Sequence, residues 1–82
     1  MHHRWPSEAE AVRRLTELGC TVRQRVESPD PRRAVTRQGS LQVAVLGITT
    51  EGCPLICLRA TLQGLGLTEA EFWVGLPDAA PS

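Results

Sequence analysis

The stretch GCPLICLRATLQGLGLTEAEFW, residues 52–73, has the strongest helical periodicity in the chain. Pro54 suits the first turn of a helix, because the amide that proline lacks would have no helical partner there. Leucines then recur at spacings of three and four, so they form one apolar stripe that must be buried against another element. Gly66 suits the left-handed residue that ends the helix, while Arg59 and Gln63 fall on its outer face. The stripe consists of Leu55, Leu58, Leu62 and Leu65.

A second, shorter helix is predicted directly after this one. Thr68 and Glu71 have the spacing of a capping box, in which each side chain accepts a hydrogen bond from the backbone amide of the other residue. Phe72 and Trp73 follow, and we expect them to fold back over the end of the leucine stripe. Trp73 is therefore predicted to be a lid on the core.

The N-terminal part of the chain predicts another capped helix. Ser7 and Glu10 form a capping box, and Gly19 stops the periodic segment. Val12 and Leu15 lie on its apolar face. We expect one domain of 70 residues or so, near the size at which a single core gives only modest stability. Its expected bounds are a flexible N-terminus at 1–6, the domain at 7–76 and a disordered tail at 77–82.

Three strands are expected between the two long helices. Apolar and polar residues alternate over 20–27, which is typical of a strand with one buried face. The two prolines in 28–31 turn the chain, and 34–36 predicts a short second strand. The most apolar segment is 41–46, which we expect at the centre of the sheet. Its expected buried residues are Leu41, Val43 and Val45.

This order of elements predicts an α+β fold of α-β-β-β-α type. The economical way to bury two apolar helix stripes is to pack both helices on one face of a three-stranded antiparallel sheet. No segment is long and apolar enough to span a membrane. An odd number of cysteines, 3, favours a reducing, cytoplasmic location over a disulfide framework.

The charge of the chain is balanced overall but uneven along it. The net charge is +0, yet eight of the nine basic residues lie before residue 41, and all nine are arginines. Two of them, Arg23 and Arg25, share one face of the first predicted strand. Such a cluster suits phosphate contacts, with RNA more probable than DNA, because sheet-and-helix RNA-binding domains read shape and phosphates; solvated surface charge is the alternative. The candidate binding residues are Arg13, Arg14, Arg23, Arg25, Arg32, Arg33 and Arg37.

The segments 11–25 (AVRRLTELGCTVRQR), 53–67 (CPLICLRATLQGLGL) and 68–72 (TEAEF) resemble the HicA family of small toxin ribonucleases, whose fold is like a double-stranded-RNA-binding domain. The resemblance implies this fold and a relation to RNA. The family places a histidine directly after a Gly-Ser on a strand, where it serves RNA cleavage. Here Leu41 follows Gly39-Ser40, so the resemblance implies a core leucine in place of the catalytic residue.

No catalytic residue, metal site or cofactor is expected. The only histidines, His2 and His3, lie at the N-terminus, and ribonuclease activity would require one of them to fold onto the sheet. Cys53 and Cys57 lack the spacing of a zinc site and a second pair, so with Cys20 they are expected to be buried and inert.

The sequence leaves two functions open. The first is a small non-catalytic nucleic-acid-binding domain related to HicA-type toxins. The second is a protein-interaction module, such as an inhibitor or antitoxin-like protein encoded by a phage or plasmid, with a homodimer as one form. Trp5, beside Pro6, is the candidate aromatic residue for binding a partner.

Overall fold

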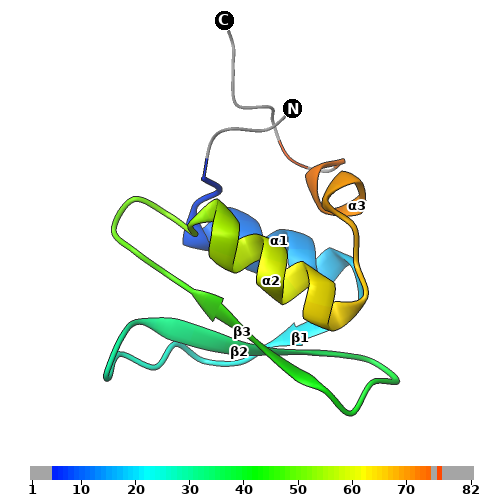
Figure 1. Ribbon diagram of the computed structural model, residues 1–82, viewed down its shortest axis with the longest axis horizontal. Helices are drawn as coiled ribbons and strands as arrows, with labels where there is room; N and C mark the ends of the chain where they lie inside the picture. The colour runs from blue at the N-terminus through cyan, green and yellow to red at the C-terminus, as the bar shows by residue number, and fades with distance from the viewer. Residues whose placement is uncertain (1–4, 75, 77–82) are drawn as a thin grey trace, which may run out of the picture.

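The computed structural model describes residues 5–74 and residue 76. A helix, three strands and two further helices follow one another, so the expected α+β order is confirmed (Figure 1). The expectations for 1–4 and 77–82, including His2 and His3, lie outside the described residues. The elements are α1 Glu8–Glu17, β1 Cys20–Val22, β2 Arg32–Arg37, β3 Val43–Gly47, α2 Leu55–Leu65 and α3 Glu69–Trp73.

The three strands form an antiparallel sheet in the order β1-β2-β3, so β2 is the central strand. This corrects the expectation that 41–46 lies at the centre. β1 is also shorter than predicted. Beyond Val22, its pairing continues only through the bond from the Arg23 amide to the Ala34 carbonyl and an isolated bridge between Val26 and Arg32.

Both long helices lie on the same face of the sheet, and the opposite face is left open (Figure 1). The core lies between these two layers. The leucine stripe is confirmed, since Leu58, Leu62 and Leu65 are buried and Leu55 packs against them. The sheet contributes Cys20, Val35, Ala44 and Leu46 to this core.

The prediction of which β3 residues face the core was wrong. Val43 and Val45 are 61% and 54% exposed, and their neighbours Ala44 and Leu46 are buried instead. Nearly every residue of this segment is apolar, so its own pattern does not select a face. The register does, because Ala44 pairs with the buried Val35, and a shift of one residue turns every side chain over.

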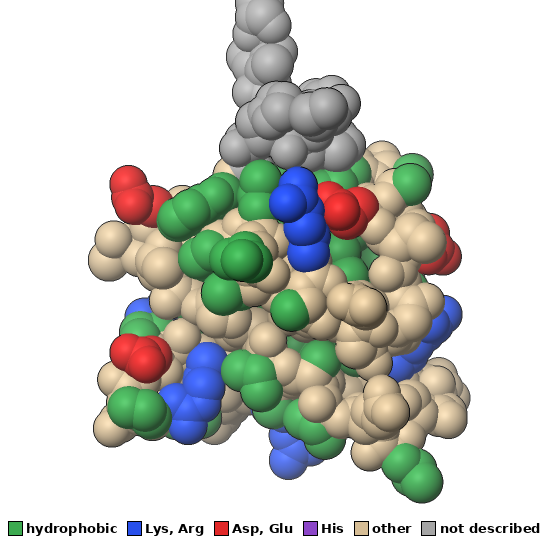
Figure 2. All heavy atoms as spheres, in the orientation of Figure 1, with side chains coloured by type: hydrophobic (Ala, Val, Ile, Leu, Met, Phe, Trp, Pro, Cys, Tyr) green, Lys and Arg blue, Asp and Glu red, His purple; other side chains and the backbone are tan. Residues whose placement is uncertain are grey.

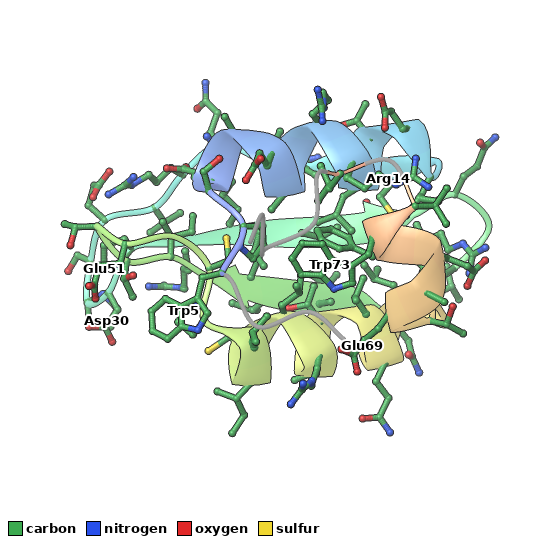
Figure 3. All side chains as sticks on the ribbon, turned by 90° about the horizontal axis from the view of Figure 1, so that it is seen from above. Trp5, Arg14, Asp30, Glu51, Glu69 and Trp73 are labelled. Atoms are coloured by element: carbon green, nitrogen blue, oxygen red, sulfur yellow. The ribbon has the colours of Figure 1, made fainter. Side chains whose placement is uncertain are left out.

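The helix ends match their sequence signals. Both capping boxes are formed, by Ser7 with Glu10 and by Thr68 with Glu71, and Gly66 closes α2 with a φ of 72°. Trp73 is buried, as predicted for a lid, and its ring meets that of Phe72 edge to face. Seen from above, Trp73 lies between α1 and α2 (Figure 3).

Pro6 belongs to the packed domain, which differs from the expected flexible lead-in. Its side chain is buried, and its carbonyl accepts a hydrogen bond of 2.8 Å from the Cys53 amide. Gly52 makes this approach possible, because a Cβ at that position would lie 2.5 Å from the Pro6 oxygen. The entry to α1 is thereby joined to the entry to α2. Among the described residues, no helix has the length and apolar character needed to cross a membrane.

Candidate interaction surface

The structure divides the predicted arginine cluster between two ends of the molecule. At one end, Arg14 of α1 donates to the carbonyls of Glu71 and Phe72, at 2.7 and 3.0 Å, and so ties α1 to α3. Nearby, Arg37 of β2 donates to the Leu65 carbonyl at 2.9 Å. These two arginines satisfy carbonyls at helix ends, which have no helical partner of their own.

At the other end, two arginines bond one carboxylate, and a third arginine lies beside the same concavity. Glu8, in the first turn of α1, accepts a bond of 2.7 Å from Arg25 and one of 2.8 Å from Arg33. The bond from Arg33, followed by that from Arg25, holds the pKa of Glu8 below its usual range. Arg13 joins these residues in lining a concavity of about 580 Å³. Arg13, Arg25 and Arg33 are the largest group of the predicted binding arginines that the fold brings together.

The remaining two arginines lie apart from both groups. Arg32 donates to the carbonyls of Ser28 and Asp30 and so stabilises the loop between β1 and β2. Arg23 is exposed on the open face of the sheet, because its register partner is Ala34. The fold therefore does not collect the seven arginines on one patch. Arg14, Arg25, Arg32, Arg33 and Arg37 are among those that bond groups of their own chain.

A different surface stands out at the outer edge of the sheet. The Ile48 amide donates to the Pro31 carbonyl, which makes this register pair a hydrogen-bonded one. Bonded and non-bonded pairs alternate along an antiparallel ladder. Counting back from Ile48, Leu46 and Ala44 are therefore in hydrogen-bonded pairs with β2. The N–H and C=O groups of the residues that alternate with them point away from β2, toward the outer edge of the sheet. These residues are Val43, Val45 and Gly47.

This edge has no charged side chain, proline or bulge over its 5 residues, which are among the features that protect natural edges. Its protection comes instead from α2, which lies along part of it. The opposite edge is different: β1 has 3 residues and is followed by Arg23 and Arg25. In the described chain, Thr61 of α2 alone occupies an outward group of β3, by donating to the Val45 carbonyl at 2.6 Å.

The outer side of α2 continues this surface above β3. Ile56 is 78% exposed, Ala60 is exposed, and Cys57 is half-buried. Figure 2 views this side of the molecule and shows hydrophobic side chains and uncharged atoms over its middle, with most charged side chains toward the rim. We call the set Val43, Val45, Gly47, Ile56, Cys57 and Ala60 the α2–β3 surface.

An apolar pocket of about 700 Å³ opens at one end of the α2–β3 surface. Its walls come from the end of β3, the loop after it and α2, with Asp30, Pro31 and Arg32 from the loop before β2 and its first residue. The Cys57 sulfur lies against Gly47, where an added Cβ would approach it to 3.3 Å. The pocket is lined chiefly by Val45, Gly47, Ile48, Pro54, Cys57 and Ala60.

Two further exposed apolar residues flank this region. Leu41, in the hairpin before β3, is 102% exposed, so the expectation of a core leucine after Gly39-Ser40 is wrong. Trp5 is 37% exposed, and in Figure 3 its ring lies beside the start of α2. The position proposed for Trp5 as a partner-binding residue is thus near the pocket end of the α2–β3 surface.

The cysteines carry no metal-site geometry within the described chain. No group of three or more metal-ligating side chains is found there. Cys20 and Cys53 are buried, and burial raises the pKa of the Cys53 thiol to about 11, which keeps it protonated at neutral pH. Cys57 differs from the expectation of burial, because it is only partly buried and lines the pocket.

Comparison with protein-family models, with curated proteins and with solved structures finds no match. The resemblance to HicA toxins therefore stays a prediction from the sequence.

Proposed function

We propose that this chain is a non-catalytic protein-interaction module that binds through the α2–β3 surface. The observation that carries the proposal is the group of exposed apolar side chains on β3 and α2, Val43, Val45 and Ile56, beside an apolar pocket. Exposed apolar patches of this kind mark protein interaction sites. Within this proposal we include the narrower class expected from the sequence, a phage- or plasmid-encoded inhibitor or antitoxin-like protein.

The arrangement of the arginines supports this choice over nucleic-acid binding. A phosphate-binding surface needs guanidinium groups that are free to meet successive phosphates. Here Arg14, Arg32 and Arg37 donate to backbone carbonyls, while Arg25 and Arg33 share the carboxylate of Glu8. Releasing them for a ligand would expose unpaired groups in the fold.

Nucleic-acid binding keeps one specific observation in its favour. The concavity lined by Arg13, Arg25 and Arg33 gathers three guanidinium groups, of which Arg25 and Arg33 bond Glu8 and Arg25 also bonds Glu27. RNA would meet this end of α1 rather than the α2–β3 surface, so substitutions separate the two functions.

The test compares three matched variants of a tagged chain in quantitative capture from cells of its source. Val45→Asp places a charge on the α2–β3 surface, and Val74→Asp places one at an 80%-exposed valine outside it. Arg13→Glu alters the arginine concavity. We expect Val45→Asp to reduce capture of a defined protein at least about tenfold, since an unpaired charge in an apolar interface costs several kcal/mol, and the other two variants to bind normally.

A parallel titration with double- and single-stranded RNA and DNA, at low and high salt, distinguishes the second function. Salt-sensitive binding that Arg13→Glu weakens and Val45→Asp leaves intact would overturn the proposal in favour of nucleic acid. Capture that is equal in the wild type and in Val45→Asp would also contradict it.

A further inference from the structure

Two carboxylates at the pocket end of the α2–β3 surface have no partner within the described chain. Asp30 lines the apolar pocket of about 700 Å³, and Glu51 follows Thr50, which lines it too. In Figure 3 both lie at the same end of the molecule. Every other acidic side chain that the structure describes is hydrogen-bonded or ion-paired; these are Glu8, Glu10, Glu17, Glu27, Glu69 and Glu71. The two carboxylates that are left over therefore lie where the pocket opens.

We propose that this pocket binds a bulky apolar side chain of a partner protein, from a segment that also carries a lysine or arginine for Asp30 and Glu51. The inference rests on the proposed function, because it names the chemistry of the partner that the α2–β3 surface takes. The partner enters with a side chain and does not add a strand to the sheet, since α2 already lies along that edge, where Thr61 bonds the Val45 carbonyl at 2.6 Å.

The walls of the pocket suit an apolar anchor. Those from α2 are Pro54, Cys57 and Ala60, and Val45 of β3 faces them with a side chain that is 54% exposed. The volume lies in the range of about 300–1,000 Å³ over which protein pockets hold ligands, so a phenylalanine, tryptophan or leucine side chain fits. A bulky side chain seated in such a pocket carries much of the binding energy at protein interfaces. Val45 also belongs to the α2–β3 surface, so the partner's contacts continue from the pocket onto that surface.

The charges around the pocket favour a basic partner over an acidic one. Arg32 also lines the pocket, but its guanidinium donates to the Ser28 and Asp30 carbonyls, at 2.9 and 3.0 Å, and is held on its own loop. Arg25 lines a neighbouring concavity with Glu51, and it is paired with two other carboxylates. The Asp30 and Glu51 carboxylates therefore remain for a lysine or arginine of the partner.

A polypeptide fits these features better than the other kinds of ligand. A small apolar molecule would use the walls and leave the two carboxylates unpaired. A nucleic acid would bring phosphates toward Asp30 and Glu51, and like charges oppose binding. A protein segment reaches both, because a bulky apolar side chain and a basic one can stand close together on the same chain.

Selection from a library of random peptides displayed on phage, against the immobilised full chain, tests the proposal. We expect the recovered peptides to combine a phenylalanine, tryptophan or leucine with a nearby lysine or arginine. A synthetic copy of the strongest binder is then titrated against the chain by fluorescence anisotropy, beside a copy in which glutamate replaces its basic residue. The second copy should bind more weakly, because it brings a like charge to Asp30 and Glu51.

Variants of the chain separate the pocket from the charges at its mouth. Ala60→Trp fills the pocket from an exposed position and should raise the Kd of the peptide at least about tenfold. Asp30→Asn combined with Glu51→Gln should raise it at least about threefold at low salt and less at high salt. Glu69→Gln and Val74→Asp, which lie outside the pocket, are the matched controls and should bind like the wild type. Circular dichroism of each variant checks that the fold is kept.

The Cys57 thiol of the wild type reports on the pocket without any substitution. Because Cys57 lines the pocket, bound peptide should slow its alkylation by iodoacetamide in proportion to the fraction of chain that is occupied. Failure to select any peptide would overturn the proposal, as would selected peptides without a basic residue. Binding that Ala60→Trp leaves intact, or that leaves Cys57 unprotected, would overturn it too.

The capture experiment distinguishes this inference from the proposed function. Capture of a protein that Val45→Asp abolishes, but that Ala60→Trp and the doubly neutralised variant leave intact, would remove the inference and leave the proposed function standing. Capture that Val45→Asp leaves intact would contradict the proposed function itself.

Discussion

The Thr61 hydroxyl lies 2.6 Å from the Val45 carbonyl and 2.9 Å from the Cys57 carbonyl, so one side chain joins the third strand to the second long helix. Thr61 is buried, although it is polar. Its bond holds α2 over the edge strand and thereby shapes the α2–β3 surface. A buried polar group of this kind is tolerated because its hydrogen bond is made.

Replacing Thr61 with valine should destabilise the fold by about 1–3 kcal/mol, because the shape is kept while the Val45 carbonyl loses its internal partner. Urea unfolding followed by circular dichroism measures the change. Thr61→Ser keeps the hydroxyl and should cost less than Thr61→Val. Equal stability of Thr61→Val and the wild type would show that this bond has no net effect.

Two arginines of the predicted binding set should differ sharply in their structural role. Arg37 donates to the Leu65 and Gly66 carbonyls at the end of α2, and we expect Arg37→Met to lower the free energy of unfolding by about 1.5–3 kcal/mol. Arg23 is exposed, so Arg23→Met should change it by less than about 0.5 kcal/mol. Denaturant midpoints of the two variants give the comparison, and similar values for both would contradict it.

Acid should weaken the link between α1 and the β1–β2 region. The guanidinium of Arg33, then that of Arg25, lowers the folded-state pKa of Glu8 below its usual value of 4.5. Its contribution is therefore complete above the unfolded-state value and is lost as the pH falls through the lowered folded-state value. Glu8 is partly exposed, so the contribution is about 1 kcal/mol at most.

The measurement is unfolding stability between neutral pH and about pH 3 for the wild type and Glu8→Gln. Glu8→Gln should be less stable near neutrality, and the difference should shrink below about pH 4.5. Glu51, exposed in the loop before α2, supplies the control Glu51→Gln, which should follow the wild type. A difference that stays constant with pH would contradict the assignment.

Glycine is required at residue 52 for a reason that does not apply at residue 39. Both have positive φ angles, 121° and 86°, but a Cβ at Gly52 would lie 2.5 Å from the Pro6 carbonyl oxygen, while Gly39 faces open space. Gly39→Ala should cost about 1–2 kcal/mol from backbone strain alone. Gly52→Ala should cost clearly more, and thermal unfolding of the two variants would show it.

The three thiols should react with iodoacetamide at very different rates. Cys57 is only partly buried and lines the pocket, whereas Cys20 and Cys53 are buried and burial raises the pKa of each. Mass spectrometry of the native protein should find one rapid modification, at Cys57, and three after denaturation. Modification of Cys53 as fast as Cys57 would show that the packing of Pro6 over this region opens readily.

Local signals in the sequence were sufficient for the helices. The spacing of Leu58, Leu62 and Leu65, the two capping boxes and the left-handed Gly66 each depend on residues within one or two turns, and the structure confirms all of them. The order of the helices and the number of strands followed from where the spacing of apolar residues changes from helical to alternating along the chain. These features are local, because helical hydrogen bonds and caps join residues close in sequence.

Only the tertiary structure decided which side of each strand faces the core and which surface is free. The segment 41–48 is apolar on both faces, and its register with Val35 is set by packing against α2, where Gly64 meets Ala44. The hydrogen-bond partners of the arginines are likewise distant in sequence. Arg37 donates to a carbonyl at the end of α2, and Arg33 donates to Glu8, 25 residues away. The sequence does not show whether an arginine faces solvent or bonds the carbonyls at a helix end, because its partners belong to elements that only folding brings near.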